Sequence, residues 1–80
     1  MRLDKFLKVS RIIKRRTVAN EACDQGRVSV NGRVAKASVD VNAGDVIEIR
    51  FGEKLFKAEI LNVAELVLKN DAADLYKVIL

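Results

Sequence analysis

The 80-residue chain contains no histidine, no proline and no tryptophan, and it has a single cysteine, Cys23. Without a second cysteine no internal disulfide can form, and without histidine neither a Cys/His zinc site nor a Ser–His catalytic pair is available. No apolar run approaches the roughly 20 residues of a membrane span. The four glycines are spaced as turn residues and form no phosphate-binding loop. We therefore expect a non-enzymatic protein without metal or cofactor, in a reducing, cytoplasmic setting.

Acidic side chains are scarce in the first 36 residues. This part holds ten Lys/Arg against three Asp/Glu, a local charge of +7, whereas residues 37–80 hold five against eight, a local charge of −3. A basic half joined to a mildly acidic half is typical of a polyanion-binding face on an ordinary scaffold. Length and composition fit one globular domain over residues 1–80, with no linker-like stretch inside it.

Hydrophobic spacing predicts two helices at the N-terminal end. Residues 2–13 predict an amphipathic helix whose polar side carries three cations together with Asp4. A second helix is expected over about 18–25, with Thr17 as its N-cap and Gly26 as its stop. Its apolar residues are small, which lets it lie close to the first helix; they are Val18, Ala19, Ala22 and Cys23.

Alternating apolar residues then predict a small antiparallel sheet, which makes the fold class α+β. Asn31-Gly32 predicts a tight hairpin turn, because both residues tolerate positive φ. Phe51 and Phe56 lie on strands and are expected in the core, so base stacking is not expected to dominate any RNA contact. The C-terminal end is ambiguous between a short helix over 71–75 and a last strand over 76–80.

The cations of the basic half are candidate RNA contacts. An isolated cation such as Lys5 can be explained as an ordinary solvated surface charge. Lys14, Arg15 and Arg16, however, are adjacent and have few acids nearby. Arginine can hold a phosphate through two hydrogen bonds. RNA is favoured over DNA because the second helix is short, largely apolar and net negative, so it does not suit a major groove. The predicted RNA-binding residues are Arg2, Lys5, Lys8, Arg11, Lys14, Arg15, Arg16, Arg33 and Lys36.

A set of short motifs over about residues 2–50 resembles the S-four RNA-binding domain, named for ribosomal small-subunit protein four. The motifs are residues 2–7 (RLDKFL), 14–17 (KRRT), 26–28 (GRV), 30–32 (VNG), 35–36 (AK) and 44–45 (GD), with Ala19, Ser38 and Val41. The resemblance implies an αL-type motif of two helices and a hairpin that sits on structured RNA. In that family the basic loop between the helices and the face of the first helix contact the RNA.

Four segments carry a closer resemblance: residues 1–11 (MRLDKFLKVSR), 24–27 (DQGR), 35–38 (AKAS) and 50–55 (RFGEKL). Through them the chain resembles, among stand-alone members, the bacterial RqcP (YabO) family of ribosome quality-control factors. This resemblance implies binding to stalled 50S subunits carrying peptidyl-tRNA, contacts to 23S rRNA and the tRNA, and support of alanine tailing by RqcH. It implies RNA contact through Arg2, Lys5, Lys8, Arg15 and Arg16, in a protein expected to be monomeric. Three alternatives stay open: an S-four-type heat-shock protein that rescues blocked 50S subunits, a detached targeting module for an RNA-modifying enzyme, and a ribosome-associated or general RNA chaperone. The lack of a long basic tail after Leu80 favours the RqcP interpretation over the heat-shock protein.

Overall fold

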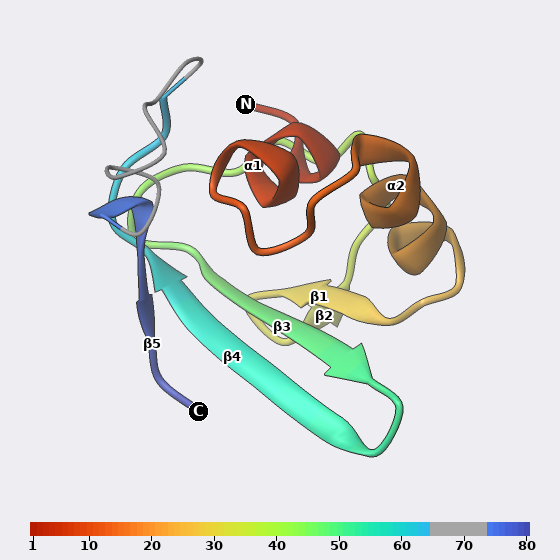
Figure 1. Cartoon of the computed structure of the whole chain (residues 1–80). Helices are drawn as coiled ribbons and strands as arrows, with labels where there is room; N and C mark the ends of the chain where they lie inside the picture. Colours follow the sequence, from red (N-terminus) through yellow and green to blue (C-terminus); the bar gives the residue numbers. More distant parts are fainter. Residues whose placement is uncertain (65–73) are drawn as a thin grey trace.

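A computed structural model describes residues 1–64 and 74–80 of the chain. Two short helices lie over one face of a five-stranded antiparallel sheet (Figure 1). This arrangement confirms the predicted α+β fold with two N-terminal helices and a small antiparallel sheet. The elements are α1 (Leu3–Val9), α2 (Arg16–Asp24), β1 (Val28–Val30), β2 (Arg33–Val34), β3 (Val46–Phe51), β4 (Lys54–Ile60) and β5 (Tyr76–Val78), and the sheet order is β2-β1-β3-β4-β5.

The core forms between the helices and the sheet. Strand register places Val28 opposite Ile49 and Ile47 opposite Ala58, and all four side chains are buried beneath the helices. From α1 the buried set includes Leu3, Phe6 and Leu7, as the periodicity predicts. The opposite face of the sheet carries polar residues such as Glu48 and Lys57. Nζ of Lys57 lies 3.5 Å from Oε1 of Glu48. The strands therefore show the alternation of a sheet with one solvated face.

The first helix is shorter than predicted. It ends at Val9 rather than at residue 13, because Arg11 adopts a left-handed conformation with φ of +63°. Ser10 is buried, and its Oγ donates to the Leu7 carbonyl at 3.3 Å. Ile13 still reaches the core, 7% exposed, but from the connection and not from a helix. The apolar spacing therefore predicts the burial of Ile13 correctly, but the helical conformation that it predicts at this position is wrong.

The second helix begins earlier than predicted. Arg15 is its N-cap residue, extended and without a side-chain cap, and Thr17 lies inside the helix. The prediction of a Thr17 cap is therefore wrong. Ala19, Ala22 and Cys23 are buried as expected, whereas Val18 is 46% exposed. Small side chains on the buried side let α2 pack against both α1 and β1.

The hairpin and turn predictions are confirmed. Asn31 and Gly32 have φ values of +51° and +84°, as a turn with two left-handed residues requires. The Asn31 side chain donates to Asp45 Oδ1 at 3.1 Å and accepts from the Val46 amide at 2.9 Å. This links the hairpin to the turn over 42–45. Phe51 is 43% exposed, so its predicted place in the core is wrong.

The two C-terminal predictions have different outcomes. The last strand is present as β5, which is shorter than the predicted 76–80. The alternative helix from Asp71 falls largely on residues 65–73, outside the described part of the chain. Over residues 1–64 and 74–80, no helix has both the length and the apolarity that crossing a bilayer requires.

Candidate nucleic-acid interface

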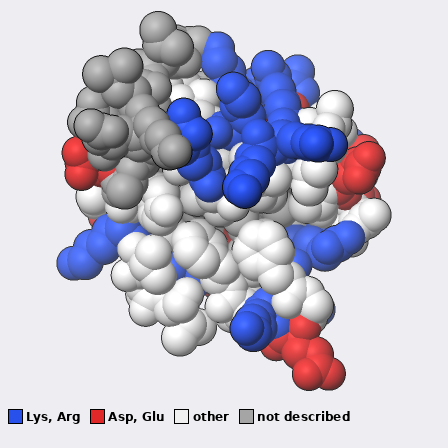
Figure 2. All heavy atoms as spheres, in the orientation of Figure 1, with Lys and Arg blue, Asp and Glu red and all other residues white. Residues whose placement is uncertain are grey.

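Lysine and arginine side chains gather over α1 and the connection that joins it to α2 (Figure 2). Eight of the nine predicted RNA-binding residues are exposed, and Lys5 is half-buried. Seven of the nine lie on α1, on its N-cap, on the connection or at the start of α2, and we call them the helical basic face: Arg2, Lys5, Lys8, Arg11, Lys14, Arg15 and Arg16. Arg33 lies on β2 and Lys36 in the loop that follows.

The loop over residues 35–41 holds the start of α1 in place. The Leu3 amide donates to the Val39 carbonyl at 2.8 Å, and the Asp4 amide donates to the Ala37 carbonyl at 3.2 Å. Arg2 pairs with Asp40 in an isolated antiparallel bridge. The backbone of Arg2, the N-cap residue of α1, is therefore fixed by contacts far along the sequence. The side chain of Arg2 therefore extends from a backbone that is held in place.

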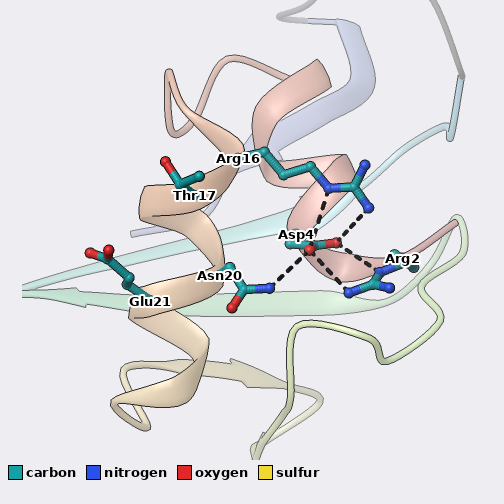
Figure 3. A pocket seen from close by; sticks show the side chains of 6 residues that line it. All are labelled: Arg2, Asp4, Arg16, Thr17, Asn20 and Glu21. Atoms are coloured by element: carbon teal, nitrogen blue, oxygen red, sulfur yellow. Dashed lines mark hydrogen bonds and ion pairs between the residues drawn. The ribbon is translucent and has the colours of Figure 1, made fainter.

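A buried carboxylate lies at the centre of the helical basic face. Asp4 is 2% exposed, and it accepts hydrogen bonds from both Nε and Nη2 of Arg2, each at 3.2 Å. From α2, Nη2 and Nε of Arg16 lie 3.4 Å from its two oxygens, and Asn20 Nδ2 donates at 3.3 Å. The Lys5 amide donates to Oδ1 at 2.8 Å. One carboxylate thus holds two guanidinium groups from two helices, as Figure 3 shows.

The charge of Asp4 is maintained by these donors. Burial by itself would raise the pKa of this carboxyl, but hydrogen bonds from Arg2, Arg16 and Asn20 and the charge of Arg16 bring the pKa below its ordinary value. Asp4 is therefore ionised at neutral pH. An ionised carboxylate fixes the rotamers of both arginines, since each guanidinium meets it with two nitrogens.

Both arginines keep donors available to a ligand. The side chains of Arg2 and Arg16 are 50% and 47% exposed. Together with Asp4, Asn20, Thr17 and Glu21 they line a shallow hollow of about 470 Å³ between the two helices. Thr17 and Glu21 point away from Asp4 (Figure 3). A guanidinium has five N–H donors, so a fork that uses two on Asp4 can still present others to a phosphate.

The sequence pattern places Asp4 on the polar side of the first helix and selects neither Asp4 nor Asn20 as a site residue. The structure corrects this, because Asp4 is buried and links α1 to α2. The available signal was an acid at position 4 of a basic stretch, two residues after one arginine and twelve before another. The structure does not bring all nine cations together. Arg33 and Lys36 do not line the hollow between the helices.

Cys23 and the acidic side chains are the remaining candidates for reactive chemistry in the described residues. Cys23 is buried; desolvation, together with the charges of Asp4 and Asp24, raises the pKa of its thiol to about 11. At neutral pH it is a protonated core residue rather than a nucleophile. Within the same part of the chain, the acidic and cysteine side chains do not come together in any group of three that could hold a metal ion.

Comparison with known proteins assigns the family. The S4 domain model matches residues 1–47, which span both helices, Asp4 with the side chains that donate to it, and the hairpin. The chain belongs to the S4 domain family. It is 63% identical over 78 residues to the RQC P-site tRNA stabilizing factor of Halalkalibacterium halodurans, covering 98% of this chain and 89% of that protein. It is 56% identical over 79 residues to the factor of the same name from Streptococcus pneumoniae, covering 99% and 90%.

A solved structure of another protein has the same fold. Heat shock protein 15 of Vibrio cholerae, described as trimeric, superposes with a TM-score of 0.89 at 32% sequence identity, covering 98% of this chain and 80% of that one. The family resemblance read from the motifs is thus confirmed. The helical basic face lies within the matched S4 domain.

Proposed function

We propose that this protein is a non-enzymatic RNA-binding factor of ribosome-associated quality control, which stabilises the P-site tRNA on large ribosomal subunits carrying a stalled peptidyl-tRNA. The observation that carries the proposal is the 63% identity, over nearly the whole chain, to a relative named for stabilising that tRNA.

The helical basic face supports an RNA ligand. Two of its arginines, Arg2 and Arg16, are oriented by the buried carboxylate of Asp4, and its other cations add positive charge. Oriented forks suit phosphates at fixed positions, which folded RNA offers and a flexible polyanion does not. In this proposal the face lies against 23S rRNA and the bound tRNA. Arg33 and Lys36, placed apart from the hollow, make separate backbone contacts.

The finer part of the proposal concerns the next step. By holding peptidyl-tRNA in place, the protein would support RqcH as that factor adds alanines to the stalled chain in the cytoplasm. It would do so as a monomer, with no cofactor and no chemistry of its own. A second candidate, rescue of a blocked subunit without tailing, is favoured by the fold shared with heat shock protein 15.

Co-sedimentation tests the first step. Purified protein is mixed with 50S subunits that carry peptidyl-tRNA, with vacant 50S subunits and with intact 70S ribosomes, and the pelleted fraction is measured. We expect strong preference for the tRNA-bearing 50S subunit. Equal binding to vacant subunits would refute tRNA stabilisation.

Reconstituted tailing with RqcH and alanyl-tRNA then separates the two candidates. Stimulation of alanine addition supports the quality-control function, whereas release of the tRNA without added alanines supports rescue. Light scattering on the free protein tests the monomeric state.

A further inference from the structure

A second hollow, of about 250 Å³, lies on the other side of α2, between that helix and the end of β3. Its floor is apolar and buried, formed by Ile13, Ala22 and Ile49. Its two walls are apolar but exposed: Val18 on α2 is 46% exposed and Phe51 on β3 is 43% exposed. The hollow is too small for most drug-sized ligands, which need at least about 300 Å³, and suits one planar ring or side chain.

The ring of Phe51 is held in a fixed position. It meets Phe56 edge-to-face, with centroids 6.5 Å apart and an interplanar angle of 71°, and Phe56 meets Tyr76 in the same way at 6.2 Å and 67°. A row of three rings on neighbouring strands thus supports an exposed aromatic face at its end. Such a face needs no reordering before another flat ring stacks on it.

The hollow adjoins the helical basic face. Arg27 and Arg50 lie at its edge, where the Arg50 amide donates to the Arg27 carbonyl at 2.9 Å, but the register places Arg50 on the face of Leu55 and not on that of Phe51. Glu21 is the acid in the lining. Ile12 and Ile13, which also line it, directly precede Lys14 of the helical basic face. Figure 2 shows uncharged surface directly below the cationic cluster.

We propose that this hollow receives one unpaired RNA base, which stacks on Phe51 while the cations of the adjoining helical basic face hold its flanking phosphates. The proposal rests on the RNA-binding function proposed above and adds a base-stacking site to it. Bases splayed from loops and bulges stack on aromatic and arginine side chains in this manner. The cations that directly follow Ile12 and Ile13 favour a nucleotide over an apolar side chain of a protein partner, which would need no cation beside it. Phosphates on Lys14–Arg16 would place a neighbouring nucleotide within reach.

Tryptophan fluorescence gives a direct readout, because the chain has no tryptophan of its own. Phe51→Trp places a fluorophore in the hollow. Leu55→Trp is the matched control: Leu55 is 44% exposed on the same hairpin, but it pairs with Arg50 while Phe51 pairs with Lys54, so it faces the other side of the sheet. Both variants are titrated with a labelled RNA stem-loop that has an unpaired loop and with a blunt duplex of the same length. Anisotropy of the label reports binding independently.

We expect the stem-loop to quench Phe51→Trp and not Leu55→Trp, and the duplex to quench neither. Phe51→Ala should weaken stem-loop binding by about 5- to 150-fold, the range for loss of one base stack. If anisotropy shows binding while Phe51→Trp is unquenched, the base site is refuted and the RNA-binding function stands. If neither RNA binds, both proposals fail. If Phe51→Ala loses only ribosome association, with RNA affinity intact, the hollow serves a protein side chain and the base proposal is overturned.

Discussion

Replacing Asp4 by asparagine separates two accounts of the helical basic face. If the face works by charge alone, removing a negative charge should tighten RNA binding. If Asp4 instead orients Arg2 and Arg16, the same change should weaken it. The side chain keeps its size, and an amide oxygen can still accept from Asn20 or the Lys5 amide. What is lost is the charge that holds both guanidinium groups.

The expected size of the effect follows from the two freed side chains. Binding then has to immobilise two half-exposed arginines, at a cost of about 0.5–1.5 kcal/mol each. Together they amount to about 1–3 kcal/mol, or roughly a 5- to 150-fold weaker dissociation constant. Unfolding free energy should fall by about 1–3 kcal/mol for the lost charged hydrogen bonds. A chain of this length has about 4–12 kcal/mol in total, so the variant should stay folded.

Binding is measured by anisotropy of a labelled RNA stem-loop and by co-sedimentation with 50S subunits, at one fixed salt concentration. Asp24→Asn is the matched control, because Asp24 is an exposed acid on α2 and its loss changes the net charge equally. We expect Asp24→Asn to bind as well as wild type or slightly better. If a folded Asp4→Asn binds as tightly as Asp24→Asn, Asp4 does not orient the arginines.

Three further perturbations test other parts of the structure. Arg16→Ala should weaken 50S association by about 1–3 kcal/mol if it holds a phosphate by two bonds, with Arg16→Lys recovering only part; equal recovery by lysine would show that charge suffices. Gly32→Val should lower the unfolding free energy by about 1–3 kcal/mol in denaturant titrations, because a β-branched residue rarely adopts the φ of +84° found at this position. Gly32→Asn should be tolerated, and an unchanged stability with valine would contradict the turn. The pKa of Asp4 in the folded protein lies below the reference value of 3.8, so the stability that ionised Asp4 contributes is complete above that pH and is lost as pH falls through the folded pKa. Wild type and Asp4→Asn should therefore converge in unfolding free energy below about pH 4. A constant difference down to pH 2 would contradict an ionised Asp4 held by its donors.

Local chemistry explains why much of the fold was predictable. Asn31-Gly32 dictates its turn because few other residues accept two positive φ values in succession. Alternation over β3 and β4 follows from one buried and one solvated face. Arg11 shows where such reasoning stops. Its left-handed conformation ends α1, although arginine is a good helix former and the apolar spacing continues to Ile13. Tertiary burial of Ile13 outweighs local helix propensity there.

The site was predictable as a list of cations and not as an arrangement. Lysine and arginine counts indicate a polyanion ligand, but they do not indicate which cations are fixed in space. Orientation depends on Asp4, whose burial comes from the packing of α2 on α1 and from the loop that pins the start of α1. Exposure of Phe51 likewise depends on how far β3 extends beyond the helices. Periodicity assigns a residue to a face of a strand and does not show whether that face is covered.

A buried acid in a basic surface lowers the net positive charge but orients the arginines that bind it. Asp4 cancels one of the positive charges that would attract RNA, and its own burial is unfavourable. In return, Arg2 and Arg16 are held at 3.2–3.4 Å from one carboxylate, although they come from different helices. The relative position of α1 and α2 therefore fixes the separation of the two forks. A disordered basic segment with the same net charge could match the attraction but not that separation, so a face built in this way favours RNA whose phosphates are themselves fixed by folding.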